Sequence, residues 1–125
     1  NGIEDLAEEI FGPVLHIATF EAGEIDALVE RINARGYGLT MGLHSRIVDA
    51  SEEVATLARV GNLYVNRSMI GAVVGSQPFG GERMSGTGPK AGGPHYLPRF
   101  AVERTVTVDT TSAGGNASLL SIDAT

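Results

Sequence analysis

The sequence predicts an α/β fold in which short parallel strands alternate with two amphipathic helices. Apolar residues recur with the spacing of one helix face in residues 24–35 and again in residues 49–60. Short runs rich in apolar residues lie before, between and after these two stretches, as expected for strands of a buried sheet. This β-α-β-α-β order favours a parallel sheet with right-handed crossovers.

The first strand is expected at residues 14–20, a run that follows the breaker pair Gly12-Pro13 and that we expect to be buried. The first helix should extend from about residue 24 to residue 35, with Gly36 at its C-cap. Its inward face would be formed by Ile25, Leu28, Val29 and Ile32.

The second and third strands are expected at residues 39–44 and 62–66. Between them a second helix should begin near Asp49, which has the spacing of a capping box with Glu52. The inward stripe of this helix would be formed by Val54, Leu57 and Ala58, and Gly61 would end it.

The second half of the chain is less regular. Residues 67–98 show no periodicity, and an irregular stretch of this length in a compact domain is usually functional or disordered. Phe79, Tyr96 and the apolar run at residues 69–74 argue against disorder. Residues 101–109 then alternate in the manner of a strand, whereas the small residues that follow allow no assignment.

Composition excludes several classes of protein. Hydrophobic residues make up 42% of the 125 residues and charged residues 19%, which is typical of a soluble globular core. The net charge of −6 and the scattered Lys and Arg residues argue against a nucleic-acid partner. The longest apolar run is too short for a transmembrane segment. Without a signal sequence or any cysteine, a cytoplasmic location is expected, and the three separated histidines suggest no metal site.

Three blocks of residues together resemble the aldehyde dehydrogenase superfamily. They read EEIFGPV at residues 8–14, GNLYVN at residues 61–66, and PFGG at residues 78–81 followed by Ser85-Gly86. The resemblance covers nearly the whole chain. It implies that residues 1–100 are a parallel-sheet piece of the catalytic domain, ending in a long glycine-rich loop region. Residues 101–125 would then be an oligomerisation-type strand and a tail.

The same resemblance assigns the first block to the cofactor NAD. A carboxylate can accept hydrogen bonds from both hydroxyls of a ribose, and an aromatic ring can pack beside the nicotinamide. Glu9 would therefore hold the nicotinamide ribose, and Phe11 would bound the nicotinamide pocket. Without the resemblance, a solvated Glu9 and a Phe11 in ordinary core packing would be the default interpretation.

The substrate is indicated by residues 66–97. After Ser85-Gly86 the sequence departs from the generic superfamily pattern and looks like the L-glutamate γ-semialdehyde dehydrogenases, most of all that domain of the bifunctional proline utilization A flavoenzymes. Residues 67–80 resemble their aldehyde-anchor loop. The resemblance implies that the N–H groups of Gly71 and Ala72 bind the α-carboxylate of the substrate and that Phe79 is an aromatic wall. A simple tight turn at Gly71 and Ala72 is the alternative.

The chain lacks residues that aldehyde oxidation requires, so we expect it to be inactive by itself. It has no cysteine and no Gly-x-Gly-x-x-Gly motif, so the nucleophile, its base and the dinucleotide fold are expected in the remainder of a longer dehydrogenase chain. The start at Asn1, with Met41 as first methionine, also predicts a fragment. FAD would be bound only if the complete protein also has a proline dehydrogenase domain, which would lie outside this chain. The sequence leaves this open, although residues 113–120 resemble the end of proline utilization A.

Two further functions remain open at this stage. A stand-alone module could hold a carboxylate with the loop at residues 71–79. An interaction protein could instead add residues 101–109 to the sheet edge of a partner. In the favoured enzyme interpretation, the same strand makes a homo-oligomer.

Overall fold

The computed structural model describes residues 2–73, 75–109 and 111. Within this part, the helices and strands follow the order α1 (Ile25–Ala34), β1 (Thr40–Leu43), α2 (Val48–Leu57) and β2 (Asn62–Val65). The strands β1 and β2 are parallel, with Thr40 opposite Asn62 and Leu43 opposite Val65. A small α/β unit with a parallel sheet is therefore confirmed, although it contains two strands where three were expected.

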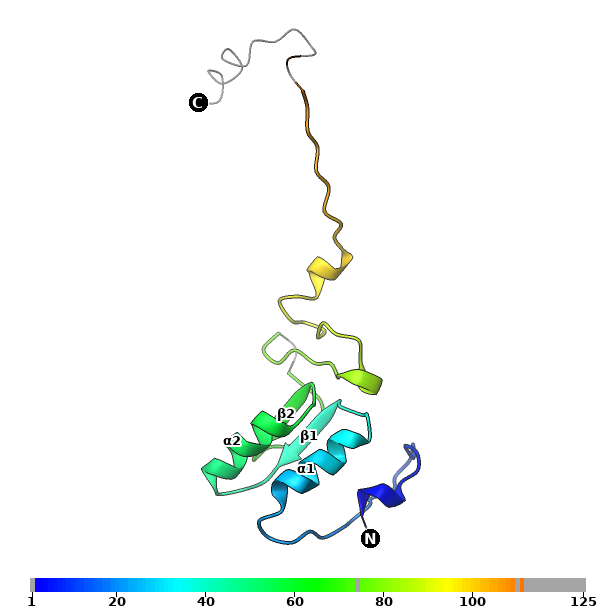
Figure 1. Ribbon diagram of the computed structural model, residues 1–125, viewed down its shortest axis with the longest axis vertical. Coiled ribbons are helices and arrows are strands. Elements are labelled where there is room, and N and C mark those ends of the chain that lie inside the picture. The colour runs from blue at the N-terminus through cyan, green and yellow to red at the C-terminus, as the bar shows by residue number, and fades with distance from the viewer. Residues whose placement is uncertain (1, 74, 110, 112–125) are drawn as a thin grey trace.

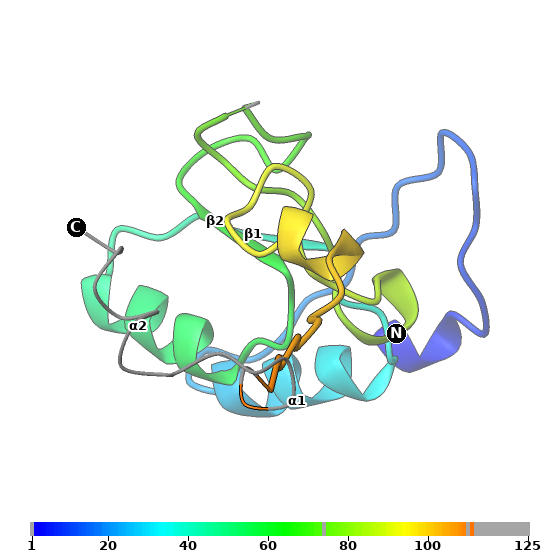
Figure 2. The same ribbon diagram turned by 90° about the horizontal axis from the view of Figure 1, so that it is seen from above.

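Three short 3-10 helices complete the described elements: η1 (Ile3–Asp5), η2 (Arg83–Ser85) and η3 (Leu97–Phe100). Figures 1 and 2 show α1 and α2 on one side of the two strands, with the loops that follow β2 on the other side. Among the described residues no helix is both long enough and apolar enough to span a membrane.

The core of the described part is small. Its buried hydrophobic residues are Val29 of α1, Val54 of α2 and Tyr64 of β2, with exposed fractions of 3%, 3% and 6%. Val29 and Val54 belong to the inward stripes that the helical spacing predicts. Those two stripes are the part of the packing that local periodicity could specify.

The ends of the two helices are tied together by one side chain. The Nδ2 group of Asn33, near the end of α1, donates a hydrogen bond of 2.9 Å to the Leu57 carbonyl oxygen. The Oδ1 atom of Asn33 accepts the Arg59 N–H at 2.9 Å. Asn33 therefore satisfies backbone groups at the end of α2 that the helix itself leaves unpaired. After α1, Gly36 has a φ of 82°, the left-handed conformation expected at a glycine that ends a helix.

The predicted capping box is wrong. The helix α2 has Ile47 as its N-cap, and no side chain caps it. The turn before α2 is held instead by Ser45, whose Oγ accepts the Ile47 N–H at 3.0 Å. Asp49 therefore lies inside the first turn, where its charge favours the positive end of the helix dipole. The helix also ends earlier than expected, at Leu57 rather than beside Gly61.

The strand expected at residues 14–20 is not formed. All seven residues are exposed, and none belongs to a strand. A β-strand requires a neighbour that receives its N–H and carbonyl groups, and in the described part of the chain β1 and β2 pair with each other. The apolar run therefore lies bare along the surface, so the prediction of a buried strand is wrong for this structure.

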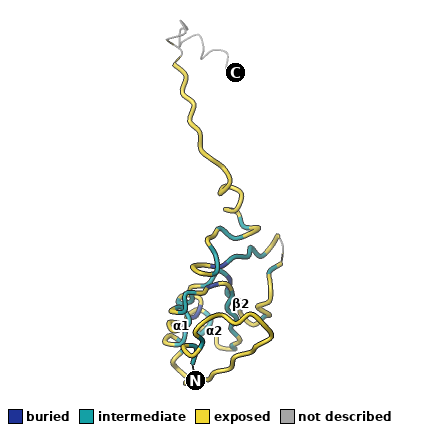
Figure 3. Tube along the Cα trace, turned by 90° about the vertical axis from the view of Figure 1, so that its right-hand side faces the viewer, coloured by how far each residue is buried: buried dark blue, intermediate teal, exposed yellow. Residues whose placement is uncertain are grey.

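Residues 101–109 also form no strand. They extend away from the body of the molecule, as Figures 1 and 3 show, and every one of them is exposed. The sequence alternation was sufficient to predict extended backbone, but not a pairing partner. Residues 113–120, whose resemblance bears on a flavin domain, lie outside the described residues.

Candidate functional site

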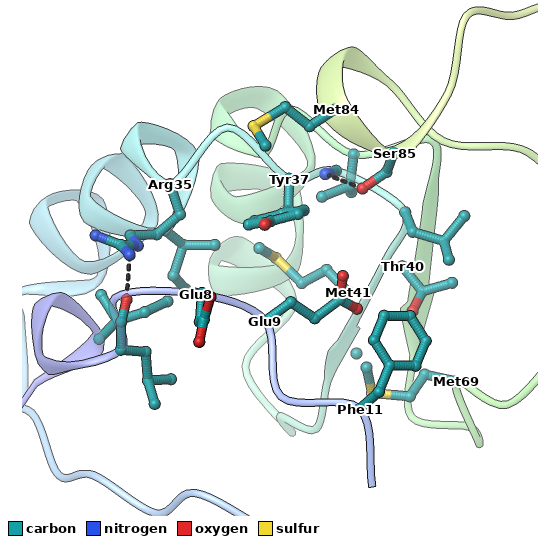
Figure 4. A pocket seen from close by; sticks show the side chains of 17 residues that line it. Glu8, Glu9, Phe11, Arg35, Tyr37, Thr40, Met41, Met69, Met84 and Ser85 are labelled. Carbon is teal, nitrogen blue, oxygen red and sulfur yellow. Dashed lines mark hydrogen bonds between the residues drawn. The ribbon is translucent and has the colours of Figure 1, made fainter.

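An open pocket with a volume of about 710 Å³ lies between the N-terminal segment and β1 (Figure 4). Glu8, Glu9 and Phe11 line it from the N-terminal segment, and Thr40, Met41 and Gly42 line it from β1. The remaining walls come from η1 and the residue after it, the end of α1 and the segment that follows it, the residues before β2, the loop after β2, and η2: Ile3, Leu6, Ile32, Arg35, Tyr37, Gly38, Leu39, Val60, Met69, Met84 and Ser85. Two sequence-predicted residues, Glu9 and Phe11, therefore meet in one pocket.

Polar side-chain contacts attach the N-terminal segment to α1 and to the residue that follows it. The guanidinium group of Arg35 donates a hydrogen bond to the Leu6 carbonyl oxygen. Arg31 and Glu4 form an ion pair with 3.7 Å between Nε and Oε1. Because both side chains of that pair are about half exposed, it adds little stability by itself. The hydrogen bond at Leu6 therefore connects the segment that carries Glu9 to the end of α1.

Glu9 and Phe11 are both available to a ligand. Glu9 is exposed, and its carboxylate has no hydrogen-bond or ion-pair partner among the described residues. The Phe11 side chain is 91% exposed, so ordinary core packing does not explain it. In Figure 4 both side chains extend from the N-terminal segment beside β1. Among the described residues the pocket thus offers a carboxylate without a partner and an exposed aromatic ring two residues apart.

A glycine of β1 brings the loop after β2 into the same pocket. A Cβ atom added to Gly42 would lie 2.9 Å from the Sδ atom of Met69, closer than side chains tolerate. The absence of a side chain at Gly42 therefore leaves room for Met69 against the strand. Met69 lines the pocket two residues before Gly71.

Gly71 and Ala72 do not line this pocket. Gly71 is exposed and has a φ of 69°, which favours glycine. Within the described part of the chain, neither its N–H group nor that of Ala72 donates a hydrogen bond. No atom of a described residue lies within 4 Å of a Cβ built on Gly71. The two adjacent N–H groups are therefore free to receive an anion.

Phe79, the third predicted substrate residue, also lies outside the pocket. Its backbone forms an antiparallel bridge with Ala91, with N–H to oxygen distances of 3.1 and 2.9 Å in the two directions. The residues on either side of Phe79 are hydrogen-bonded to Asn62 of β2. The side chain of Phe79 is half-buried. The backbone around Phe79 is therefore held by hydrogen bonds to Ala91 and Asn62.

The sequence did not single out the asparagines of the β2 region. Asn62 is buried, with an exposed fraction of 8%, and Asn66 has a left-handed φ of 55°. Asparagine is depleted in strands, so two of them in the run at residues 62–66 were a signal that special contacts are needed. Which contacts they make is visible only in the structure.

Metal-binding groups and shifted pKa values are further features that bear on a functional site among the described residues. No group of three or more His, Cys, Asp or Glu side chains that could hold a metal occurs there. Protonated Glu53 can donate a hydrogen bond to the Asp26 carboxylate, and this bond raises the pKa of Glu53 above its ordinary value. Asp26 belongs to α1 and Glu53 to α2, so this pair bears on the packing of the helices and not on the pocket.

These features define an α/β unit with an open pocket beside a parallel sheet and a glycine loop with free backbone donors. Residues 3–106 match the model of the aldehyde dehydrogenase family. The chain therefore belongs to the aldehyde dehydrogenase family, which confirms the resemblance seen in the three sequence blocks.

Two similar proteins indicate which members of this family the chain resembles. The chain is 59% identical over 104 residues to the bifunctional protein PutA of Klebsiella aerogenes, covering 83% of this chain and 8% of that protein. It is 46% identical over 102 residues to 1-pyrroline-5-carboxylate dehydrogenase of Oceanobacillus iheyensis, covering 82% of this chain and 19% of that protein. The chain thus spans less than a tenth of the length of its bifunctional relative and about a fifth of that of the dehydrogenase.

Solved structures agree with the sequence relatives. A structure of proline utilization A with proline bound in remote sites has a TM-score of 0.81 and 55% identity, covering 89% of this chain and 11% of that one. A variant of the Bradyrhizobium japonicum protein has a TM-score of 0.80 and 56% identity, covering 87% of this chain and 11% of that one. The observed α/β unit therefore matches a piece of an aldehyde dehydrogenase domain.

Proposed function

We propose that the chain is the C-terminal part of an NAD-dependent L-glutamate γ-semialdehyde dehydrogenase, which oxidises the semialdehyde to L-glutamate in proline catabolism. One observation supports this substrate: within the described part of the chain, the N–H groups of Gly71 and Ala72 donate no hydrogen bond. Similarity to 1-pyrroline-5-carboxylate dehydrogenase and to PutA supports the same assignment. Residues 1–100 would belong to the catalytic domain in a cytoplasmic enzyme.

In this proposal Glu9 and Phe11 serve the cofactor. The Glu9 carboxylate accepts hydrogen bonds from the two hydroxyls of the nicotinamide ribose, and the Phe11 ring limits where the nicotinamide can lie. Bound NAD supplies the hydride acceptor for the oxidation. Two observations support these roles. Among the described residues the Glu9 carboxylate has no hydrogen-bond or ion-pair partner, and the Phe11 ring is exposed. The flavin FAD would be bound only by a proline dehydrogenase domain outside this chain.

The loop after β2 serves the substrate. The N–H groups of Gly71 and Ala72 donate hydrogen bonds to the α-carboxylate, and Phe79 packs against the aliphatic carbons. A carboxylate that receives charge-assisted hydrogen bonds is bound more tightly than an uncharged group in the same place. The loop therefore distinguishes glutamate semialdehyde from simple aldehydes, while Phe79 contributes to the binding of both.

Residues 101–125 would serve assembly. Val102, Val106 and Val108 are all exposed on the extension that leaves the body after η3. An extended segment with exposed valines and unpaired backbone groups is suited to join the edge of another sheet. We infer that it pairs in a homo-oligomer of the complete enzyme, and this exposure supports the inference.

The proposal is tested by comparing two purified proteins: the 125-residue chain alone and the complete enzyme that contains it. The complete enzyme should reduce NAD in the presence of glutamate γ-semialdehyde. The isolated chain should not, because it has no cysteine to add to the aldehyde. Turnover by the isolated chain above a protein-free blank would contradict the proposal. Binding of glutamate by the isolated chain without any effect of NAD would favour a stand-alone carboxylate-binding module.

A further inference from the structure

The side chain of Asn62 is buried on β2 and is hydrogen-bonded to both neighbours of Phe79. Its Nδ2 group donates to the Pro78 carbonyl oxygen at 3.1 Å, and its Oδ1 atom accepts the Gly80 N–H at 3.3 Å. The second Nδ2 hydrogen is directed to the Tyr64 hydroxyl at 3.2 Å. Both Nδ2 hydrogens and the Oδ1 atom thus have partners. An amide is needed here because this position must donate and accept at once.

Two hydrogen bonds between Val73 and Gln77 connect Pro78 with the proposed carboxylate donors at Gly71 and Ala72. The Gln77 Oε1 atom accepts the Val73 N–H at 3.1 Å, and the Gln77 N–H donates to the Val73 carbonyl oxygen at 2.9 Å. Val73 directly follows Ala72, and Gln77 directly precedes Pro78. The attachment of Pro78 to Asn62 of β2 therefore restrains the position of Ala72 through Gln77 and Val73.

The beginning of the same loop is attached to the same strand. The Arg67 guanidinium carbon lies 4.4 Å from the centroid of the Tyr64 ring. Tyr64 is itself the hydroxyl partner of Asn62, and residues two apart on a strand share one face. One face of β2 thus holds both ends of the segment from Arg67 to Gly80.

We propose that Asn62 is a positioning residue that sets the preference of the enzyme for aldehydes carrying a carboxylate. It acts through its hydrogen bonds to the backbone of Pro78 and Gly80, which keep the N–H donors of Gly71 and Ala72 in place relative to the sheet. Asn62 itself touches neither substrate nor cofactor. The inference rests on the proposed function, because it assigns Asn62 to the same substrate loop.

The test uses two variants of the complete enzyme. Asn62→Ala removes every hydrogen bond of the amide. Asn62→Asp keeps the size and the acceptor for Gly80 but removes the donor and places a carboxylate oxygen against the Pro78 carbonyl. Both should raise KM for glutamate γ-semialdehyde about tenfold or more, whereas kcat, KM for NAD, and kcat/KM for propionaldehyde should change less than about threefold. Asn62→Asp should be no milder than Asn62→Ala, because repulsion replaces a hydrogen bond.

Asn33→Ala is the matched control. It also removes two hydrogen bonds between an asparagine side chain and the backbone, but at the junction of α1 and α2. It should lower the melting temperature without selective loss of glutamate semialdehyde. If Asn62→Ala does not fold, the isosteric Asn62→Asp variant decides alone.

The outcomes separate this inference from the proposed function. Equal losses on both aldehydes, unchanged KM in both Asn62 variants, or a selective loss in Asn33→Ala would overturn the role of Asn62. A wild-type enzyme that does not prefer glutamate γ-semialdehyde to propionaldehyde would overturn the proposed function itself, before any variant is compared.

Discussion

Gly61 and Gly80 lie so close together that a Cβ atom on Gly61 would overlap the Gly80 carbonyl oxygen. Gly61 immediately precedes β2, and Gly80 immediately follows Phe79. The Lys90 ammonium group also donates a hydrogen bond to the Gly61 carbonyl oxygen. The approach of two glycine backbones therefore brings the start of β2 against the end of the substrate loop.

Replacing Gly61 with alanine should destabilise the complete enzyme. The new methyl group meets backbone atoms that cannot rotate away, and overpacking of this kind typically costs about 1–3 kcal/mol. The melting temperature should fall, and the semialdehyde KM should rise with it as Gly80 is displaced. Gly93→Ala is the milder comparison, because its Cβ would lie 3.1 Å from the nearest atom, the Lys90 carbonyl oxygen. Equal melting temperatures for Gly61→Ala and wild type would contradict the close approach.

Replacing Glu9 with glutamine should weaken placement of the nicotinamide. The substitution keeps the size of the side chain but removes its charge, and hydrogen bonds to charged groups contribute about 1.5–3 kcal/mol. We expect a higher KM for NAD or slower hydride transfer, measured by steady-state and single-turnover kinetics. Glu21→Gln, an exposed change outside the pocket, serves as the control. Unchanged cofactor affinity and rate in Glu9→Gln would mean that Glu9 does not hold the ribose.

Replacing Gly71 with alanine should impair the carboxylate donors selectively. There is space for the methyl group, but at a φ of 69° a Cβ atom strains the backbone by about 1–2 kcal/mol. As the backbone rotates to relieve this strain, the Gly71 and Ala72 N–H groups turn away, and kcat/KM for glutamate γ-semialdehyde should fall about tenfold. Propionaldehyde should be affected much less.

Gly92→Ala provides the control for backbone strain. Gly92 has a similar φ of 72° and likewise nothing within 4 Å of a built Cβ. It should therefore be strained equally without changing the preference between the two aldehydes. Equal losses on the two aldehydes in Gly71→Ala would show that Gly71 only shapes the loop.

Replacing Glu53 with glutamine should have an effect that depends on pH. Asp26 raises the pKa of Glu53, so the folded protein holds this proton more tightly than the unfolded chain. The resulting stability is present below the ordinary pKa of 4.5 and is lost as pH rises through the higher folded value. Glutamine mimics the protonated form, so the variant should melt at a higher temperature than wild type at pH 7. At pH 4.5 the difference should be smaller, and a difference that grows toward acid pH would contradict the pairing.

The sequence by itself determined the two helices, the strands β1 and β2, and the family. Helices are specified locally, because each backbone hydrogen bond joins residues four apart and the inward face repeats along the chain. Val29 and Val54 are buried as that spacing predicts. The three family blocks are also local strings, so they could be read without knowing which of them meet in space.

Tertiary structure alone decided which segments find partners. Residues 14–20 are an apolar run and residues 101–109 alternate as strands do, but a strand exists only where a second segment receives its hydrogen bonds. No pattern within the segment itself specifies that partner. The same holds for Asn62, whose partners Pro78 and Gly80 lie 16 and 18 residues away. Local spacing therefore fixed the helices, whereas long-range pairing fixed the edges of the sheet and the shape of the substrate loop.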